Sequence, residues 1–286
     1  MKKRYVFYTV WFFCALIFFL YRLFPGVEIK KYAEYRAKNA GYALHIGDVR
    51  PGGPRPGLVF FPVEIRDGDR VIEADALKIS PCFFSLFGSS PAMDFRAEMY
   101  GGTVEGRVKR QAGEKADGKT VMADAVLSGI KIKEIEAMQN LSGHKVSGIL
   151  EGTVTYSGSD ATGKGEADLR VRDLTVELGT PLFSLGKLTF TDMSTKLGLE
   201  NMVHLEIKEC TVKGNMLGGN MMGTVGLKQP LGKSAVDLAG SIRPHPSMIA
   251  QMGEGMAALL FKSNRGKADF PFKIRGSLEK PEFLMQ

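Results

Sequence analysis

Hydrophobic residues recur at every second position through most of the chain after residue 57, and this period is the strongest constraint on the fold. The clearest run lies at residues 270–278, where Phe270, Phe272, Ile274 and Leu278 share one phase. The residues between them are mostly polar. A period of two is typical of strands with one buried and one solvated face. The sequence therefore predicts a mainly β fold.

Two of these runs change phase, between Val171 and Leu174 and again between Ile207 and Cys210. A change of face within one strand requires a bulge, a turn or a strong twist. Glycine is also abundant, at 34 of 286 residues, or about 12% against the usual ~7%. We therefore expect many turns or bulged strands, which are features of long, curved sheets.

Three segments have helical rather than strand character. Residues 27–41 follow Pro25-Gly26 and lack internal Gly and Pro, which predicts a juxtamembrane helix. Short helices are predicted at residues 132–139 and 247–262; the second carries a methionine stripe suited to a lid packed on the sheet. The polar stretch 111–119 predicts an exposed loop and an alternative subdomain boundary within a β domain of residues 42–286.

The N-terminal segment predicts a membrane anchor. Residues 5–21 carry no charge, and Leu23 and Phe24 extend them to the length of a spanning helix. No small-x-small cleavage motif follows, which favours an uncleaved signal anchor over a signal peptide. Residues 1–26 are therefore interpreted as a cytoplasmic tail and transmembrane anchor. The residues assigned to the anchor are Tyr5, Trp11, Leu20 and Phe24.

Charge argues against nucleic-acid binding. The formal net charge is +7, but residues 1–40 hold eight Lys and Arg against two Glu, so 30 basic and 29 acidic residues are left for the other 246. The excess therefore flanks the apolar segment, as in membrane proteins. Three basic residues precede the segment and five follow it, a count that favours the reverse topology. The short basic tail and the Gly-rich body favour an exported C-terminal body instead.

No constellation of catalytic residues is present in the sequence. GSDATGKG at residues 158–165 has the glycine spacing of a phosphate-binding loop, but a strand pattern follows it, so we expect a hairpin. The four histidines are isolated from one another and from the cysteines, so no metal, cofactor or enzymatic activity is predicted. Cys82 and Cys210 form a disulfide or remain two buried thiols. The methionines, Met221 and Met222 among them, line an adaptable binding face or fill a core.

Several segments resemble the N component of the bacterial type II secretion system and the broader AsmA-like group of envelope proteins. The segments that resemble the secretion family are LFPG at residues 23–26, IGDVRPGGPRPGLVF at 46–60 and VIEADALKISPCFFSLF at 71–87. The segments that resemble the AsmA-like group are YGGTVEG from residue 100, the stretch from residue 130 to 158, and IRGSLEKPEF from residue 274. The resemblance covers nearly the whole chain and contains no catalytic signature.

The resemblance implies a single-pass bacterial inner-membrane protein with a periplasmic body. It implies a curved, largely antiparallel sheet with an open apolar groove, and a non-enzymatic accessory role in type II secretion through contacts with partner subunits. The alternative is an AsmA-like module that binds or transfers phospholipid or another acyl lipid. The candidate residues for the groove or partner face are Phe270, Phe272, Ile274, Leu278, Met221 and Met222.

Overall fold

The protein is described by a computed structural model. The described residues are 5, 7, 8, 11, 12, 15, 18, 19, 21–53, 56–67, 70–82, 85, 90–112, 119–139, 145–159, 162–182, 185–246 and 269–285. The chain divides into two compact units: unit 1 comprises Met1–Pro81 and Met93–Glu98, and unit 2 comprises Cys82–Ala92 and Met99–Gln286. The stretch 111–119 joins two strands inside unit 2, so the division falls elsewhere.

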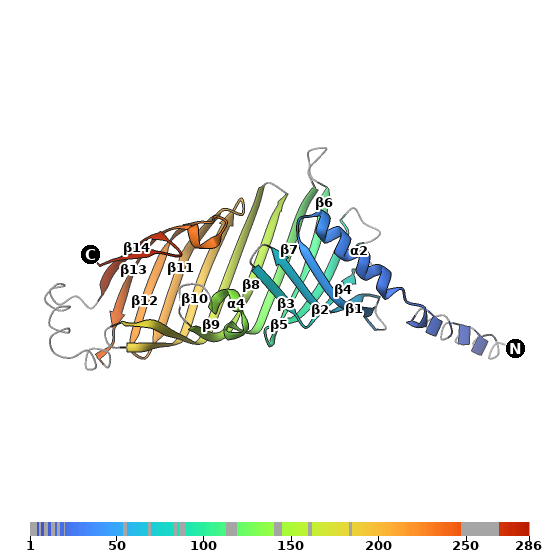
Figure 1. Cartoon of the computed structure of the whole chain (residues 1–286), viewed down its shortest axis with the longest axis horizontal. Helices are drawn as coiled ribbons and strands as arrows, with labels where there is room; N and C mark the ends of the chain where they lie inside the picture. Colours follow the sequence, from blue (N-terminus) through green and yellow to red (C-terminus); the bar gives the residue numbers. More distant parts are fainter. Residues whose placement is uncertain are drawn as a thin grey trace. The chain divides into compact units, whose positions relative to one another are not determined.

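The strands form one antiparallel sheet, which confirms the mainly β prediction (Figure 1). Unit 1 contains α2 (Gly26–Asn39), β1 (Ala43–Pro51), β2 (Leu58–Asp67), β3 (Arg70–Ala74), β4 (Ala76–Pro81) and most of β5 (Ala92–Met99). Unit 2 contains β6 (Gly102–Ala112), β7 (Lys119–Lys131), η1 (Ile132–Glu134), α4 (Glu136–Gln139), β8 (Lys145–Ser159), β9 (Thr162–Leu182), β10 (Leu185–Glu200), β11 (His204–Gly214), β12 (Leu217–Gly226), η2 (Leu231–Lys233), β13 (Ala235–Pro244), β14 (Phe270–Ser277) and β15 (Pro281–Met285).

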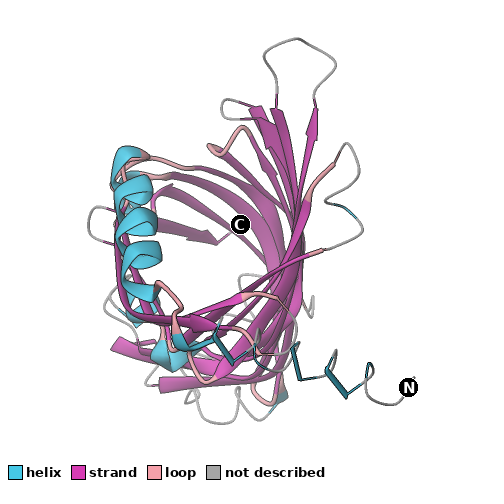
Figure 2. Cartoon of the chain, turned by 90° about the vertical axis from the view of Figure 1, so that its right-hand side faces the viewer, coloured by secondary structure: helices cyan, strands magenta, loops and turns pink. Residues whose placement is uncertain are grey.

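Within unit 2 every strand pairs with the next one along the chain, from β6 to β15. The strands are long and bend along their length (Figure 2). The hairpin between β8 and β9 contains the glycine-rich stretch considered above, with Gly158 opposite Gly163. This arrangement confirms the hairpin prediction, and a second strand stands where a phosphate-binding loop needs a helix.

Bulges occur at both predicted phase changes. Ile207 and Cys210 pair with Gly223 and Met221, so β11 contains one more residue than β12 at this point. The same mismatch occurs where Arg172 and Thr175 of β9 pair with Ile149 and Ser147 of β8. An extra residue returns the following side chains to the face that they would otherwise leave. The two interpretations from sequence are therefore confirmed.

The helix α2 confirms the helix predicted at residues 27–41 within two residues at its C-terminal end. It begins after Pro25 and ends at Asn39, two residues before Gly41, which has a φ of +90°. The Gly41 amide donates to the Lys38 carbonyl and the Tyr42 amide donates to the Ala37 carbonyl, at 3.1 and 3.0 Å. These bonds satisfy carbonyls that the last turn would leave unpaired, and glycine adopts the required left-handed conformation without steric strain.

In unit 1, α2 covers the apolar side of the first strands. Its Ile29 and Ala33 pack against a buried cluster formed by Ile46, Val49, Phe60 and Val63. Two polar contacts fix α2 along β1: the Ile46 amide donates to Glu34 Oε1 at 3.0 Å, and Lys30 Nζ donates to the Gly47 carbonyl at 3.2 Å. A helix that occupies the backbone groups of a strand in this way also protects that edge of the sheet.

Candidate functional site

One face of the unit 2 sheet is apolar across nine strands, β7 to β15. Residues that pair directly across neighbouring antiparallel strands project from the same face of the sheet. The pairing therefore defines three continuous rows that run across these strands. We call these rows together the apolar face.

The first row is Ala123, Tyr156, Gly165, Leu199, Leu205, Val225, Val236, Gly276 and Pro281. The second is Ala125, Val154, Ala167, Leu197, Ile207, Gly223, Leu238, Ile274 and Phe283. The third is Leu127, Gly152, Leu169, Thr195, Cys210, Met221, Gly240, Phe272 and Met285. Apart from Tyr156, Thr195 and Cys210, these residues have no polar group in their side chains.

The opposite face of unit 2 carries the charges. Lys208 Nζ lies 2.7 Å from Glu166 Oε1, Arg170 pairs with Asp192, and Arg275 pairs with Asp237. The hydrogen bond from Lys208, followed by its charge, holds the pKa of the Glu166 carboxyl below its usual value. Apart from Asp192, these side chains are substantially exposed, so they mark the face that is in contact with water.

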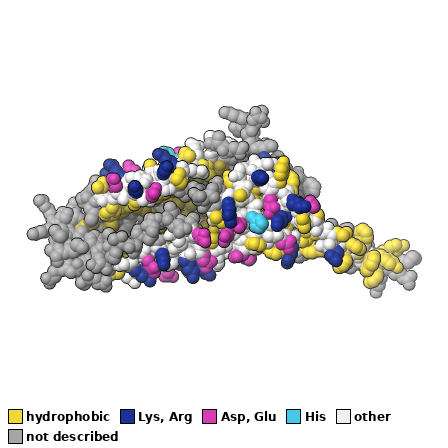
Figure 3. All heavy atoms as spheres, in the orientation of Figure 1, with side chains coloured by type: hydrophobic (Ala, Val, Ile, Leu, Met, Phe, Trp, Pro, Cys, Tyr) yellow, Lys and Arg dark blue, Asp and Glu magenta, His cyan; other side chains and the backbone are white. Residues whose placement is uncertain are grey.

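The residues of the apolar face shield one another to different degrees. Val225, Val236 and Leu238 are buried, and they form a cluster with half-buried neighbours that include Leu205 and Ile274. Phe272 is buried and its ring stacks on Phe283 at a centroid distance of 5.2 Å, whereas Phe283 itself is 51% exposed. In Figure 3, hydrophobic side chains gather in a recess of unit 2 bordered by charged side chains.

The helical elements described in unit 2 are short, and two of them pack on β8. Ile132 of η1 is buried against Val171 and Leu174. The side chain of Gln139 in α4 donates to the carbonyls of Ile132 and Val146, and it accepts the Val146 amide at 3.1 Å. The side-chain amide of Gln139 therefore continues the hydrogen bonding of the β8 backbone at Val146. The predicted helix at residues 247–262 lies outside the described residues.

The structure brings together most of the candidate groove residues. Phe270, Phe272 and Ile274 of β14 lie on the same side of the sheet as Met221 of β12, with β13 between the two strands, and Leu278 packs against the same cluster just after β14. Met222 belongs to the opposite face and is 59% exposed. Consecutive residues of a strand project to opposite faces, so only one of the two neighbouring methionines joins the apolar face.

Two of the anchor candidates, Tyr5 and Trp11, are 71% and 65% exposed, and Phe24 packs against the core of unit 1. Leu20 lies outside the described residues. No helix in the described part of the chain has the length and hydropathy of a membrane span.

The two cysteines of the body are free thiols in this structure. Cys82 is half-buried and Cys210 is buried. Burial raises the pKa of the Cys210 thiol, and a hydrogen bond with Thr195, directly opposite on β10, acts in the other direction. A raised pKa keeps the thiol protonated and unreactive. Cys210 therefore behaves as one more apolar residue of the third row.

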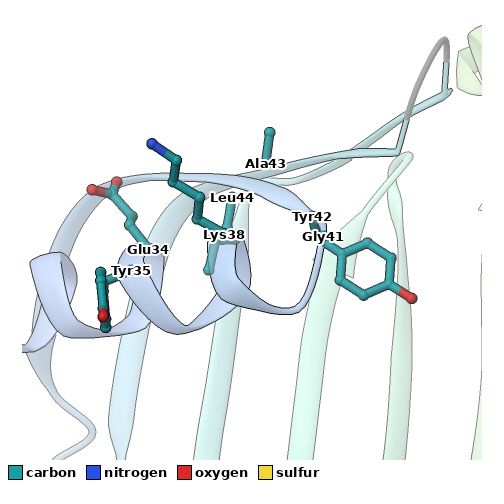
Figure 4. A pocket seen from close by; sticks show the side chains of 7 residues that line it. All are labelled: Glu34, Tyr35, Lys38, Gly41, Tyr42, Ala43 and Leu44. Atoms are coloured by element: carbon teal, nitrogen blue, oxygen red, sulfur yellow. The ribbon is translucent and has the colours of Figure 1, made fainter. Parts of the chain in front are cut away.

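The pockets of the described chain do not bring reactive groups together. One of about 480 Å³ is formed where α2 meets β1, between Glu34, Lys38 and Tyr42. Figure 4 shows the Glu34 and Lys38 side chains on one side of it and the Tyr42 ring pointing away. A second, of about 250 Å³, lies on the charged face beside the Lys208–Glu166 pair. Among the described residues, no group of three His, Cys, Asp or Glu side chains is placed to hold a metal ion.

Among the described residues, the apolar face is thus a continuous surface that extends over nine strands. Sequence reasoning placed candidate residues for this face on or just after β12 and β14 and missed the contributions of the other strands, although several of those strands alternate clearly in the sequence. Comparisons with protein-family models, with curated proteins and with solved structures find no match for this chain.

Proposed function

We propose that the protein is a non-enzymatic, membrane-anchored envelope protein whose unit 2 binds the acyl chains of lipids in an open groove along its apolar face. The observation that carries this proposal is the continuity of the three apolar rows across nine strands. Strands spaced about 4.8 Å apart give each row a length of about 38 Å. One leaflet of hydrocarbon is about 15 Å thick, so the rows have room for more than one acyl chain.

Hydrocarbon is a suitable ligand because the face offers area rather than directed hydrogen bonds. Removing apolar area from water stabilises a complex by about 25 cal/mol per Å² before the losses of association are subtracted. The charges of unit 2 lie on the other face, where they stay hydrated while a lipid chain lies on the first. The membrane anchor at residues 1–26 and the AsmA-like resemblance support a source of lipid close to the protein.

Native mass spectrometry of the full chain, purified in mild detergent with added phospholipid, tests the proposal. Leu197→Asp and Phe272→Asp each introduce a charge into the apolar face, and we expect bound lipid to fall at least tenfold. Met222→Asp introduces the same charge on the opposite face and leaves lipid binding unchanged. Circular dichroism verifies that each variant is folded. Equal lipid occupancy in Leu197→Asp and the unaltered protein would contradict the proposal.

We propose, as a second candidate function, that the protein is an accessory subunit of the type II secretion apparatus. The observation that favours it is β15, where Phe283 and Leu284 project to opposite faces and are 51% and 48% exposed. β15 ends the strand order of the sheet, and an edge strand accepts a partner strand through backbone hydrogen bonds. A photoreactive residue at Leu284 should crosslink to secretion subunits in cells, and one at Met222 should not. Absence of crosslinks at Leu284 argues against this role.

The location that accompanies both proposals is the bacterial inner membrane, with a single span and the body in the periplasm. Alkaline phosphatase is active only after export, so a fusion after Gln286 should be active in cells. An inactive fusion that is expressed at full length would put the body in the cytoplasm, as the count of flanking basic residues favours.

A further inference from the structure

The helix α2 has two chemically different sides. Its inward side carries Ile29 and Ala33, which pack on the core of unit 1, together with Glu34, which accepts the Ile46 amide. Tyr32 and Tyr35 lie on the other side and are 65% and 62% exposed. Residues three apart on a helix share a face, so the two phenol rings are neighbours there.

Basic side chains flank these tyrosines. Lys31 is exposed on the outward side, Lys38 is exposed at the border of that side, one turn after Glu34, and Arg36 adds a further charge in the last turn. The acidic residue in the first turn is Glu28, and its carboxylate lies 3.7 Å from Lys31. The outward side therefore combines amphipathic rings with a net positive charge. Tyrosine and lysine together suit the layer of a bilayer where hydrocarbon meets anionic headgroups.

The connection to the N-terminal segment keeps α2 close to the same layer. Only Pro25 separates Phe24, the last residue of the proposed anchor, from the first residue of α2 (Figure 1). The two Cα–Cα steps from Phe24 to Gly26 span at most about 7 Å, so the helix begins close to the point where the proposed anchor leaves the bilayer. Its 14 residues extend about 21 Å from there.

We propose that the outward side of α2, formed by Tyr32 and Tyr35 with Lys31 and Lys38, binds the headgroup layer of a bilayer that contains anionic phospholipid. The inference rests on the proposed anchor for its proximity to the membrane and is independent of lipid binding by unit 2. The helix thus has two simultaneous roles: one side covers the core of unit 1 and the other contacts lipid headgroups.

Photocrosslinking in proteoliposomes tests this surface with the full chain. Benzoylphenylalanine replaces Tyr32 or Tyr35 in turn, and the matched control carries it at Ala37, which is half-buried on the inward side of the same helix. In vesicles of phosphatidylcholine and phosphatidylglycerol, we expect lipid adducts at positions 32 and 35 to exceed those at position 37 at least fivefold. Lipid adducts equal to those at position 37, or adducts to protein alone, would overturn the proposal.

The charge requirement is tested in the same vesicles. Lys31→Gln together with Lys38→Gln should lower the lipid adducts at position 35 about fivefold in anionic vesicles. The same variant should leave them unchanged in vesicles of phosphatidylcholine alone. An equal effect in both kinds of vesicle contradicts recognition of anionic headgroups.

Flotation of the vesicles separates the two proposals. A chain that floats with the vesicles but forms no adducts at positions 32 and 35 is anchored without using α2. A chain that does not float overturns both the anchor and the surface on α2.

Discussion

In unit 1 the apolar side of the sheet is covered by a helix of 14 residues, whereas the helical elements described in unit 2 have three or four residues each, two of them beside β8 and one between β12 and β13. Both units have alternating strands with buried residues, but the residues are shielded by a helix in unit 1 and by neighbouring side chains of the sheet in unit 2. Ile46, beneath α2, is 2% exposed. Ile207, in the middle row of the apolar face, is half-buried by its neighbours in the sheet. Alternation therefore creates an apolar face in each unit, and the covering layer decides how completely that face is shielded from water.

We expect the largest difference in stability between the two units from a matched pair of Ile→Ala substitutions. Ile46→Ala leaves a cavity beneath α2 and should destabilise unit 1 by about 2–5 kcal/mol. Ile207→Ala removes the same atoms from a half-buried position, and its effect should be less than half as large because no enclosed cavity forms. Hydrogen exchange of peptides from β1 and from β11 measures both free energies of opening. Equal losses would show that unit 2 is covered as fully as unit 1.

A second comparison tests whether unit 2 depends on close backbone contacts instead of a cover. Gly223 has a φ of +144°, and a Cβ added there would lie 2.3 Å from the Asp237 carbonyl oxygen. Gly223→Ala should therefore destabilise unit 2 by about 1–3 kcal/mol.

Gly226→Ala is its control in the same strand, because the nearest atom to an added Cβ lies 3.9 Å away. We expect its effect to stay within about 0.5 kcal/mol. Urea unfolding monitored by circular dichroism measures both variants. A tolerated alanine at position 223 would mean that β12 and β13 can separate locally around Gly223 and Asp237 without loss of stability.

The smallest effect concerns the charged face of unit 2. Lys208 lowers the pKa of Glu166, and Arg243 lowers that of Asp269. A carboxyl group with a lowered pKa in the folded state stabilises the fold above its pKa in the unfolded chain. That contribution is lost as the pH falls through the folded-state pKa.

Lys208→Met should therefore raise the Glu166 pKa towards its usual value and reduce the loss of stability on acidification. Titration of the Glu166 carboxyl by NMR measures the first effect, and melting temperatures as a function of pH measure the second. Lys213→Met, an exposed position on the same strand, is the control. An unchanged Glu166 pKa in Lys208→Met would show that the pair is not formed in solution.

Alternation in the sequence predicted the β fold, and the two phase changes predicted a bulge, a turn or a strong twist, because both patterns are local. The cover over unit 1 was not predictable in the same way. Apart from Ile29, the inward side of α2 has small or polar residues such as Ala33 and Glu34, so its apolar stripe is weak. The role of Glu34 depends on the Ile46 amide, which reaches it only when the chain folds back.

The position of Met222 shows a second limit of sequence reasoning. Gly218, Gly219 and Gly223 surround the two methionines, and residues without side chains leave the phase of the strand unmarked. The pairing with the neighbouring strands identifies the face of each methionine, because Met221 lies opposite Cys210 and Gly240. The face of each methionine therefore becomes known only once the register of β12 is known.

The uninterrupted order of strands in unit 2 has a consequence for how such a protein changes its length. Each strand is bonded to its sequence neighbours, so inserting or deleting one complete hairpin leaves all other pairings intact. Such an event would lengthen or shorten the sheet by about 9.6 Å. Hairpins can therefore be added only along the direction in which the strands follow one another, and duplication of a gene segment that encodes one hairpin would change the length of the sheet by a fixed amount.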